Sequence, residues 1–123
     1  MTEDGSSVAP RSGVYPILVN DRVFGAMVEA IAKLSLKRGT FVTLRDVMVQ
    51  CMEGSPSAHP LVLSTMKDLA PLEGHIRIYL RLGQRQIGRV EPMKAELAKH
   101  LQREVKTRDL VCFCCLQIAH ELG

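Results

Sequence analysis

Apolar and polar residues alternate most regularly over residues 75–82, HIRIYLRL. The apolar positions are Ile76, Ile78, Leu80 and Leu82, and the polar positions between them are His75, Arg77, Tyr79 and Arg81. Successive side chains of a β-strand point to opposite faces, so this alternation predicts a strand with one apolar face and one basic, hydrogen-bonding face. The apolar face is suited to closing a core, and the other face presents arginines outward.

The first half of the chain predicts a strand and then a long helix. Residues 14–19, VYPILV, are apolar and partly β-branched, and Pro16 confines this strand to the edge of a sheet. Asn20 or Asp21 is a suitable N-cap for the helix, and two cations followed by Gly39 are typical of its end. The expected inward stripe of this helix is Phe24, Met27, Ile31 and Leu34.

A shorter helix and a connection follow. Thr43 is the expected N-cap of a helix that ends near Gly54. Its inward residues are expected to be Leu44, Val47, Met48 and Cys51. Residues 55–74 contain three of the six prolines and predict a linker, with one short helix between Pro60 and Ala70.

The second half again predicts a strand followed by two helices. Residues 83–88, GQRQIG, are expected to extend the strand, to bulge or to turn. The next helix is expected to begin around Pro92, since a first-turn position tolerates proline. Thr107 is the expected N-cap of the last helix, whose residues 111–119 are apolar nearly all round. A helix of that composition is expected at the centre of the molecule.

A short internal repeat relates the two halves. Arg45-Asp46-Val47 aligns with Arg108-Asp109-Leu110, and in each half the Arg-Asp pair lies in the first turn of the last expected helix. Acidic residues at the start of a helix are also accounted for by the helix dipole alone. The order of elements upstream of the two pairs is the same, namely strand, long helix and capped helix.

Composition and charge narrow the class of protein. The chain has 123 residues, of which 46% are hydrophobic and 24% charged, so it predicts one globular unit or two halves that share a core. Its net charge of +3 is too small to indicate a nucleic-acid partner by itself. No apolar run reaches the roughly 20 residues of a membrane span, and residues 1–13 predict a mobile tail without a signal pattern. We therefore expect a cytoplasmic protein.

The sequence predicts that the four cysteines are reduced and buried in the core. Cys112, Cys114 and Cys115 lie too close together in the sequence to join distant loops, and Cys51 lies in the first half. With His120 they offer zinc ligands, but no paired CxxC spacing is present. No glycine-rich phosphate loop or recognisable catalytic pattern occurs, so the chain predicts neither an enzyme nor a bound cofactor or metal.

The order strand, helix, helix in about 45 residues, found twice, resembles the ribbon-helix-helix family of DNA-binding proteins. The resemblance covers residues 14–122 and is to single-chain tandem forms, including the accessory proteins of conjugative and T-DNA transfer that bind the overdrive enhancer. It implies a mostly helical α+β fold in which two intertwined strand-helix-helix units form a pseudo-dimer. The units would be residues 14–54 and 75–123, joined by the linker 55–74 and sharing one core.

The resemblance also implies a DNA-binding surface. The outward positions of the second strand match those that read base edges, and they are Arg77, Tyr79 and Arg81, with His75 at the rim. The starts of the two last helices match phosphate-binding positions, at Thr43, Arg45, Thr107 and Arg108, and Arg85 and Arg89 are further candidates.

Two features depart from the family pattern. The first strand, VYPILV, offers no polar face in either register, so it is expected to contribute little to base reading. Asp46 and Asp109 lie beside the expected phosphate contacts, where a negative charge opposes the approach of DNA.

Other interpretations remain open. Arg77 and Arg81 are equally consistent with the solvated face of an ordinary strand. Arg77, Arg81, Arg85 and Arg89 share a spacing of four that would also fit a helix, but the β-branched and aromatic residues of this stretch and the interruptions at Gly83 and Gly88 favour the strand. The sequence predicts a DNA-binding accessory or regulatory protein, acting as a monomeric pseudo-dimer or a higher oligomer on double-stranded DNA, with a relaxase or other transfer proteins as further partners. The alternative is a small adaptor or chaperone of a transfer or secretion system.

Overall fold

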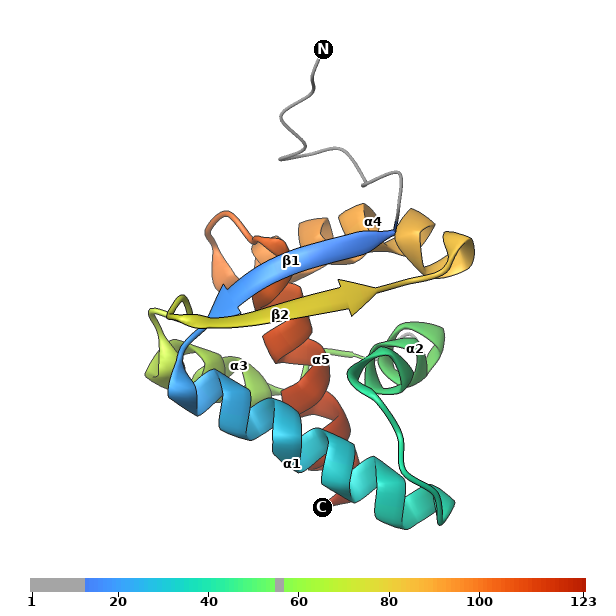
Figure 1. The fold of residues 1–123 in the computed structure, drawn as a ribbon. Helices are drawn as coiled ribbons and strands as arrows, with labels where there is room; N and C mark the ends of the chain where they lie inside the picture. Colours follow the sequence, from blue (N-terminus) through green and yellow to red (C-terminus); the bar gives the residue numbers. More distant parts are fainter. Residues whose placement is uncertain (1–12, 55–56) are drawn as a thin grey trace.

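The computed structural model describes residues 13–54 and 57–123, and most of the tail predicted for residues 1–13 lies outside them. Figure 1 shows the arrangement of the helices and strands along the chain. In chain order these are β1 (Val14–Val19), α1 (Asp21–Arg38), α2 (Leu44–Gly54), α3 (Pro60–Leu69), β2 (Ile76–Arg81), α4 (Gln84–Leu101) and α5 (Thr107–Leu122).

The two strands form an antiparallel ribbon on one side of the molecule (Figure 1). The register runs from Val14 opposite Arg81 to Val19 opposite Ile76. Pro16 is compatible with this sheet because both strands are edges, so its missing N–H can face away from the partner strand. Leu80 is only 1% exposed, and its neighbours across the ribbon on the inner face are also buried. The ribbon thus closes the core from one side.

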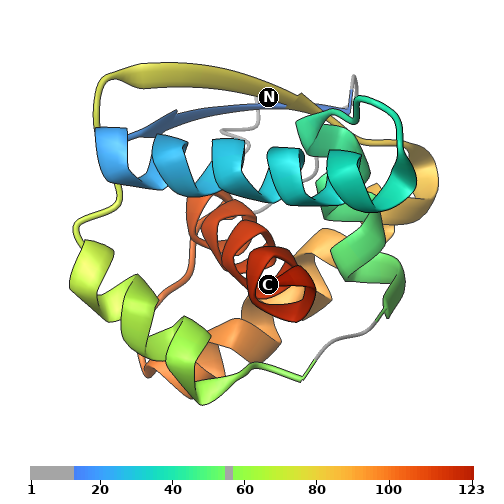
Figure 2. The same ribbon diagram turned by 90° about the horizontal axis from the view of Figure 1, so that it is seen from below.

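Helix α5 lies at the centre, with the other four helices around it (Figure 2). Every residue from Asp109 to Cys115 is buried, because α1, α2, α3, α4 and β1 all pack against this helix. A helix that is apolar all round gains stability only when each of its sides is covered. This confirms the central position predicted for residues 111–119.

The expected fold class, two intertwined strand-helix-helix units, is wrong. The described residues form five helices and a single two-stranded sheet. α1 packs extensively along α5, whereas α2 and α4, which would be the corresponding pair in two equivalent units, touch only marginally. α3, in the expected linker, also packs against α5. The physical reason is unequal burial: α5 needs a neighbour on every side, whereas α2 is shorter and buries one face.

Two helix starts also differ from the prediction. α4 begins at Gln84, so residues 84–88 form helix and Pro92 lies inside it. Proline removes the N–H that would bond the carbonyl four residues earlier, which is that of Gly88. α5 begins one residue earlier than expected, with Lys106 as N-cap and Thr107 as its first residue.

The other helix boundaries confirm the prediction. The Asn20 side chain accepts a hydrogen bond from the Val23 N–H at 2.7 Å, and Gly39 ends α1 with a positive φ of 73°. Thr43 caps α2, accepting from the Asp46 N–H at 3.3 Å. These positions are predictable because capping depends on residues close in sequence.

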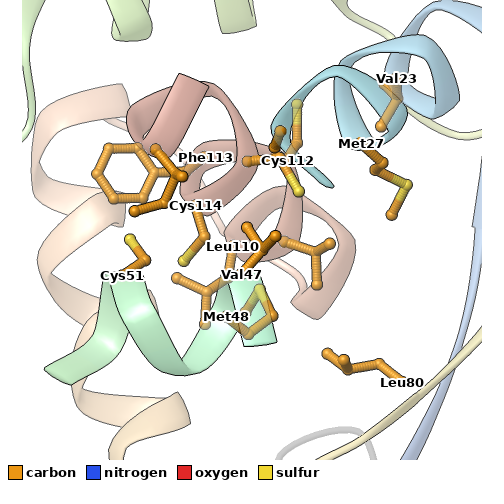
Figure 3. Packing of buried hydrophobic residues seen from close by; sticks show 14 of the residues in the cluster. Val23, Met27, Val47, Met48, Cys51, Leu80, Leu110, Cys112, Phe113 and Cys114 are labelled. Carbon is orange, nitrogen blue, oxygen red and sulfur yellow. The ribbon is translucent and has the colours of Figure 1, made fainter. Parts of the chain in front are cut away.

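The core is aliphatic and rich in sulfur (Figure 3). All four cysteines are buried free thiols, as predicted. Cys51 of α2 lies beside Cys114 of α5 (Figure 3), and their hydrogen bond, together with burial, raises the pKa of the Cys114 thiol well above its usual value. Burial raises the pKa of Cys112 to about 12. These thiols therefore contribute packing rather than reactivity.

Candidate nucleic-acid interface

The outer face of the ribbon carries the residues predicted to read bases. Arg77, Tyr79 and Arg81 all lie on this face of β2, and Tyr79 is 65% exposed. Opposite them across the ribbon are Leu18, Pro16 and Val14, respectively. Hydrogen-bonding side chains therefore occupy one strand of the ribbon and apolar side chains the other. This placement agrees with the expectation that the first strand has no polar face.

The inner face holds the ribbon to the helices. Tyr15, Ile17 and Val19 of β1 are buried there. Within the described residues the Tyr15 hydroxyl has no hydrogen-bond partner. Burial raises the pKa of this hydroxyl, and the negative charge of Glu91 raises it further. Since the inner side chains are packed, the orientation of the outer ones is set by the register of the strands.

One end of the ribbon is tied to the start of α1. The Asn20 side chain donates to the Pro71 carbonyl at 2.7 Å, and its backbone N–H donates to the Leu72 carbonyl at 2.9 Å. Gly74 makes this approach possible, because a Cβ there would lie 2.6 Å from the backbone nitrogen of Asn20. His75 is exposed at this end, with its Nε2 3.7 Å from Asp21 Oδ1.

The start of α2 lies at the opposite end of β2. Arg45 is exposed, and its Nη2 lies 3.4 Å from the position that a Cβ on Gly83 would take. The Thr43 backbone N–H donates to Asp46 Oδ2 at 2.9 Å. This hydrogen bond lowers the pKa of the Asp46 carboxyl below its usual value, and the nearby charges of Arg38 and Arg45 contribute in the same direction.

The start of α5 is built in the same way. Asp109 Oδ2 accepts a hydrogen bond from the Lys106 backbone N–H at 2.7 Å, as Asp46 does from Thr43. Arg103 also contacts the Asp109 carboxylate, at 3.3 Å. Arg108 lies 3.4 Å from Glu73 Oε1, in the segment that leads into β2. The internal repeat in the sequence is therefore a repeated helix start, even though the two halves are not equivalent units.

The two helix starts thus flank β2. Arg45 lies beside the residues that follow this strand, and Arg108 lies beside those that precede it. The first N–H groups of each helix have no partner within the helix and carry partial positive charge. Thr43 and Thr107, predicted to contact phosphates, stand at these two ends. The carboxylates of Asp46 and Asp109 reduce the positive potential at both.

The remaining two predicted phosphate contacts lie on α4. Arg85 is exposed, and its Nε lies 3.4 Å from Glu53 Oε2 of α2. Glu53 also accepts a hydrogen bond from the Gln86 side chain at 3.2 Å. Arg89 is half-buried and lines a groove on α4. The structure therefore does not bring Arg85 and Arg89 into the same row as the arginines of β2.

The groove beside α4 has a volume of about 520 Å³. Its lining is mostly apolar, and includes Ala58, Pro92, Met93, Leu97 and Phe113, with Arg89, Glu96 and His100 at its polar positions. His100 Nε2 lies 3.8 Å from Glu96 Oε2, one turn away on the same helix. Among residues 13–54 and 57–123, no group of three or more histidine, cysteine or acidic side chains is placed to hold a metal ion.

Sequence reasoning missed an exposed apolar row on α1. Phe24, expected to face inward, is 39% exposed, and Val28 and Leu36 are exposed on the same helix. Val23 and Ala30 are buried with Met27 and Leu34 instead. The signal was present as apolar residues at a spacing of four, at positions 24, 28, 32 and 36, which places them on one face.

Comparisons with family models, with curated proteins and with solved structures found no match to this chain. In the part of the chain that the structure describes, no helix is both long and apolar enough to cross a membrane.

Proposed function

We propose that this chain binds double-stranded DNA without catalysing a reaction, as an accessory or regulatory protein that places its ribbon in the major groove. The observation that carries the proposal is the row Arg77, Tyr79 and Arg81 on the outer face of β2, flanked by the starts of two helices. A role at a transfer origin or a promoter rests on the resemblance of the sequence to ribbon-helix-helix accessory proteins.

The dimensions of the ribbon are compatible with a groove. The major groove is about 12 Å wide and admits a two-stranded β-ribbon. Residues four apart on a strand are separated by about 13 Å, which spans about four base pairs of DNA. Arg77 and Arg81 could therefore reach bases at both ends of such a segment, with Tyr79 between them. An arginine fork donates to guanine O6 and N7 together, at about 1–3 kcal/mol of discrimination for each contact.

The flanking helix starts supply the second part of the proposal. A helix N-terminus binds phosphate through its unpartnered N–H groups and the helix dipole. Arg45 and Arg108 add a full positive charge to each start. Arg108 is partly neutralised by Glu73, and both starts contain an aspartate, so these phosphate contacts are expected to be weaker than those of helix starts without acidic residues.

The test is an electrophoretic mobility shift with duplex DNA containing a transfer origin or promoter, at two salt concentrations. Displacement of counterions from DNA makes affinity fall steeply with salt. The double variant Arg77→Ala plus Arg81→Ala is expected to fold normally and to lose its preference for one sequence over another. Unchanged sequence preference in this variant would contradict the assigned surface.

A charge-matched control is available on other faces of the molecule. Lys37 lies in the last turn of α1 and Lys67 in the last turn of α3, and both are exposed. The variant Lys37→Ala plus Lys67→Ala removes the same net charge as the arginine variant. It is expected to keep sequence preference, which separates a local effect of the ribbon from a general loss of positive charge.

The exposed row on α1 favours a second candidate function. Phe24, Val28 and Leu36 form an apolar strip, and Phe41 is exposed just beyond the helix. Such a strip is suited to an amphipathic helix of a partner, so an adaptor for a relaxase or another transfer protein is the alternative. If the protein is an adaptor, we expect no salt-sensitive complex with DNA. We also expect the double variant Phe24→Ser plus Val28→Ser to weaken binding to a purified relaxase.

A further inference from the structure

The outer face of the ribbon is divided lengthwise into two chemically different edges. The β2 edge offers donors and acceptors from Arg77, Tyr79 and Arg81, whereas the β1 edge presents Leu18 and Pro16, with Val14 half-buried at its end. Residues opposite one another across an antiparallel pair lie about 4.5–5.5 Å apart. Each polar side chain therefore stands beside an apolar one.

An apolar edge in the major groove can recognise only one feature of the four bases. Thymine carries a C5-methyl group there, while the other base edges present donors and acceptors. Leu18 and Pro16 have no side-chain donor or acceptor, so their contacts with DNA are limited to apolar burial. Leu18 is 38% exposed, which leaves apolar surface available for such a contact.

We propose, on the basis of the proposed function above, that the β1 edge reads thymine methyl groups and that the DNA site is consequently non-palindromic. The β2 edge would specify guanines through its arginines, and Leu18 would specify a thymine at a neighbouring position. A ribbon with equivalent side chains on both strands would instead favour a two-fold symmetric site. Here the outward residues of β1 are apolar and those of β2 are hydrogen-bonding, so a half-turn that exchanges the two strands exchanges unlike groups.

The experiment begins with selection of bound duplexes from a random pool by the full-length chain. Each thymine of the selected site is then replaced by deoxyuridine, which removes only the C5-methyl group. Loss of one buried methyl group is expected to lower affinity about fourfold at one or two positions. The selected site itself is expected to lack two-fold symmetry.

Two variants locate the effect. In Leu18→Ala the affinity is expected to become insensitive to deoxyuridine, because the apolar contact is gone. Leu61→Ala is the matched control. Leu61 is 62% exposed on α3, and its replacement by alanine removes the same atoms from a different element. This control is expected to retain the sensitivity of the unmodified protein.

The outcomes separate the two proposals. A palindromic selected site, or a salt-sensitive complex of the unmodified protein that tolerates deoxyuridine at every position, overturns the inference while leaving DNA binding standing. Sensitivity that persists in Leu18→Ala overturns the assignment of the methyl contact to Leu18. Failure to select any duplex, with no salt-sensitive complex, overturns both proposals.

Discussion

At the scale of single residues, two aspartates shape the edges of the candidate interface. Asp46 and Asp109 each accept a backbone N–H from the N-cap residue of their helix, at 2.9 and 2.7 Å. These hydrogen bonds stabilise the helix starts, but the same charges oppose phosphate. The helix starts are therefore compromises between folding and the proposed binding.

Asp46 links this compromise to pH. Its pKa is lower in the folded chain than the usual 3.8, so its contribution to stability is complete above that value and is lost as pH falls through the lower, folded pKa. Asp46→Asn is expected to unfold at a lower urea concentration than the unmodified chain at pH 7, and the difference is expected to shrink below about pH 4. Urea titrations at several pH values measure this.

Glu104→Gln is a suitable control for the pH experiment, because Glu104 is exposed outside the helices. It is expected to change the midpoint little at either pH. A difference for Asp46→Asn that stays constant from pH 7 to pH 3 would show that the carboxylate charge is not what stabilises this helix start.

At the scale of elements, the two faces of β2 differ: one is packed into the core, and the other is exposed and carries the proposed DNA contacts. Leu80 faces inward and is almost fully buried, whereas Tyr79 beside it is largely exposed. Neighbouring residues of this strand therefore differ in burial, since the alternation of side chains sends one to the core and the next to the outer face.

The two faces are expected to respond differently to truncation. Leu80→Ala leaves a cavity under the ribbon and is expected to lower the free energy of unfolding by about 2–5 kcal/mol. Tyr79→Ala is expected to change it by less than about 0.5 kcal/mol and to weaken DNA binding instead. Urea denaturation and the mobility shift together measure both effects. Equal destabilisation by the two variants would contradict the assigned faces.

At the scale of the whole molecule, the fold places the row Arg77, Tyr79 and Arg81, which we propose reads bases, between the two helix starts that we propose contact phosphates. Residues distant in the sequence achieve this, because Arg45 belongs to α2 and Arg108 to α5, while the row lies on β2. The central position of α5 brings these elements together (Figure 2).

Arg45 and Arg108 are expected to act on affinity without regard to sequence. Arg45→Ala and Arg108→Ala should each weaken binding to all duplexes similarly and reduce the slope of log affinity against log salt by about 1. Arg77→Ala should instead relax preference at one base position. Binding isotherms at several salt concentrations distinguish these patterns, and an unchanged slope in both end variants would contradict the proposed phosphate contacts.

Much of the local structure was predictable from the sequence, because it depends on neighbours in the chain. Capping by Asn20, the turn at Gly39 and the alternation in β2 all follow from local rules. The start of α4 was not predictable in this way, since Gly83 and Gly88 bracket this segment and disfavour a helix locally, whereas in the fold α4 packs against α5 and α2.

By itself the sequence determined the two-faced character of β2 and the apolar composition of α5. It also determined the repeated Arg-Asp helix start. Tertiary structure alone decided that β1 pairs with β2 in a register that sets apolar residues beside arginines, and that the two halves are not equivalent. The physical reason is that burial is a property of the assembled core. Helix α5 is stable only when all its sides are covered, and both α1 and α3 pack against it. The row Phe24, Val28 and Leu36 on α1 is left exposed in this arrangement.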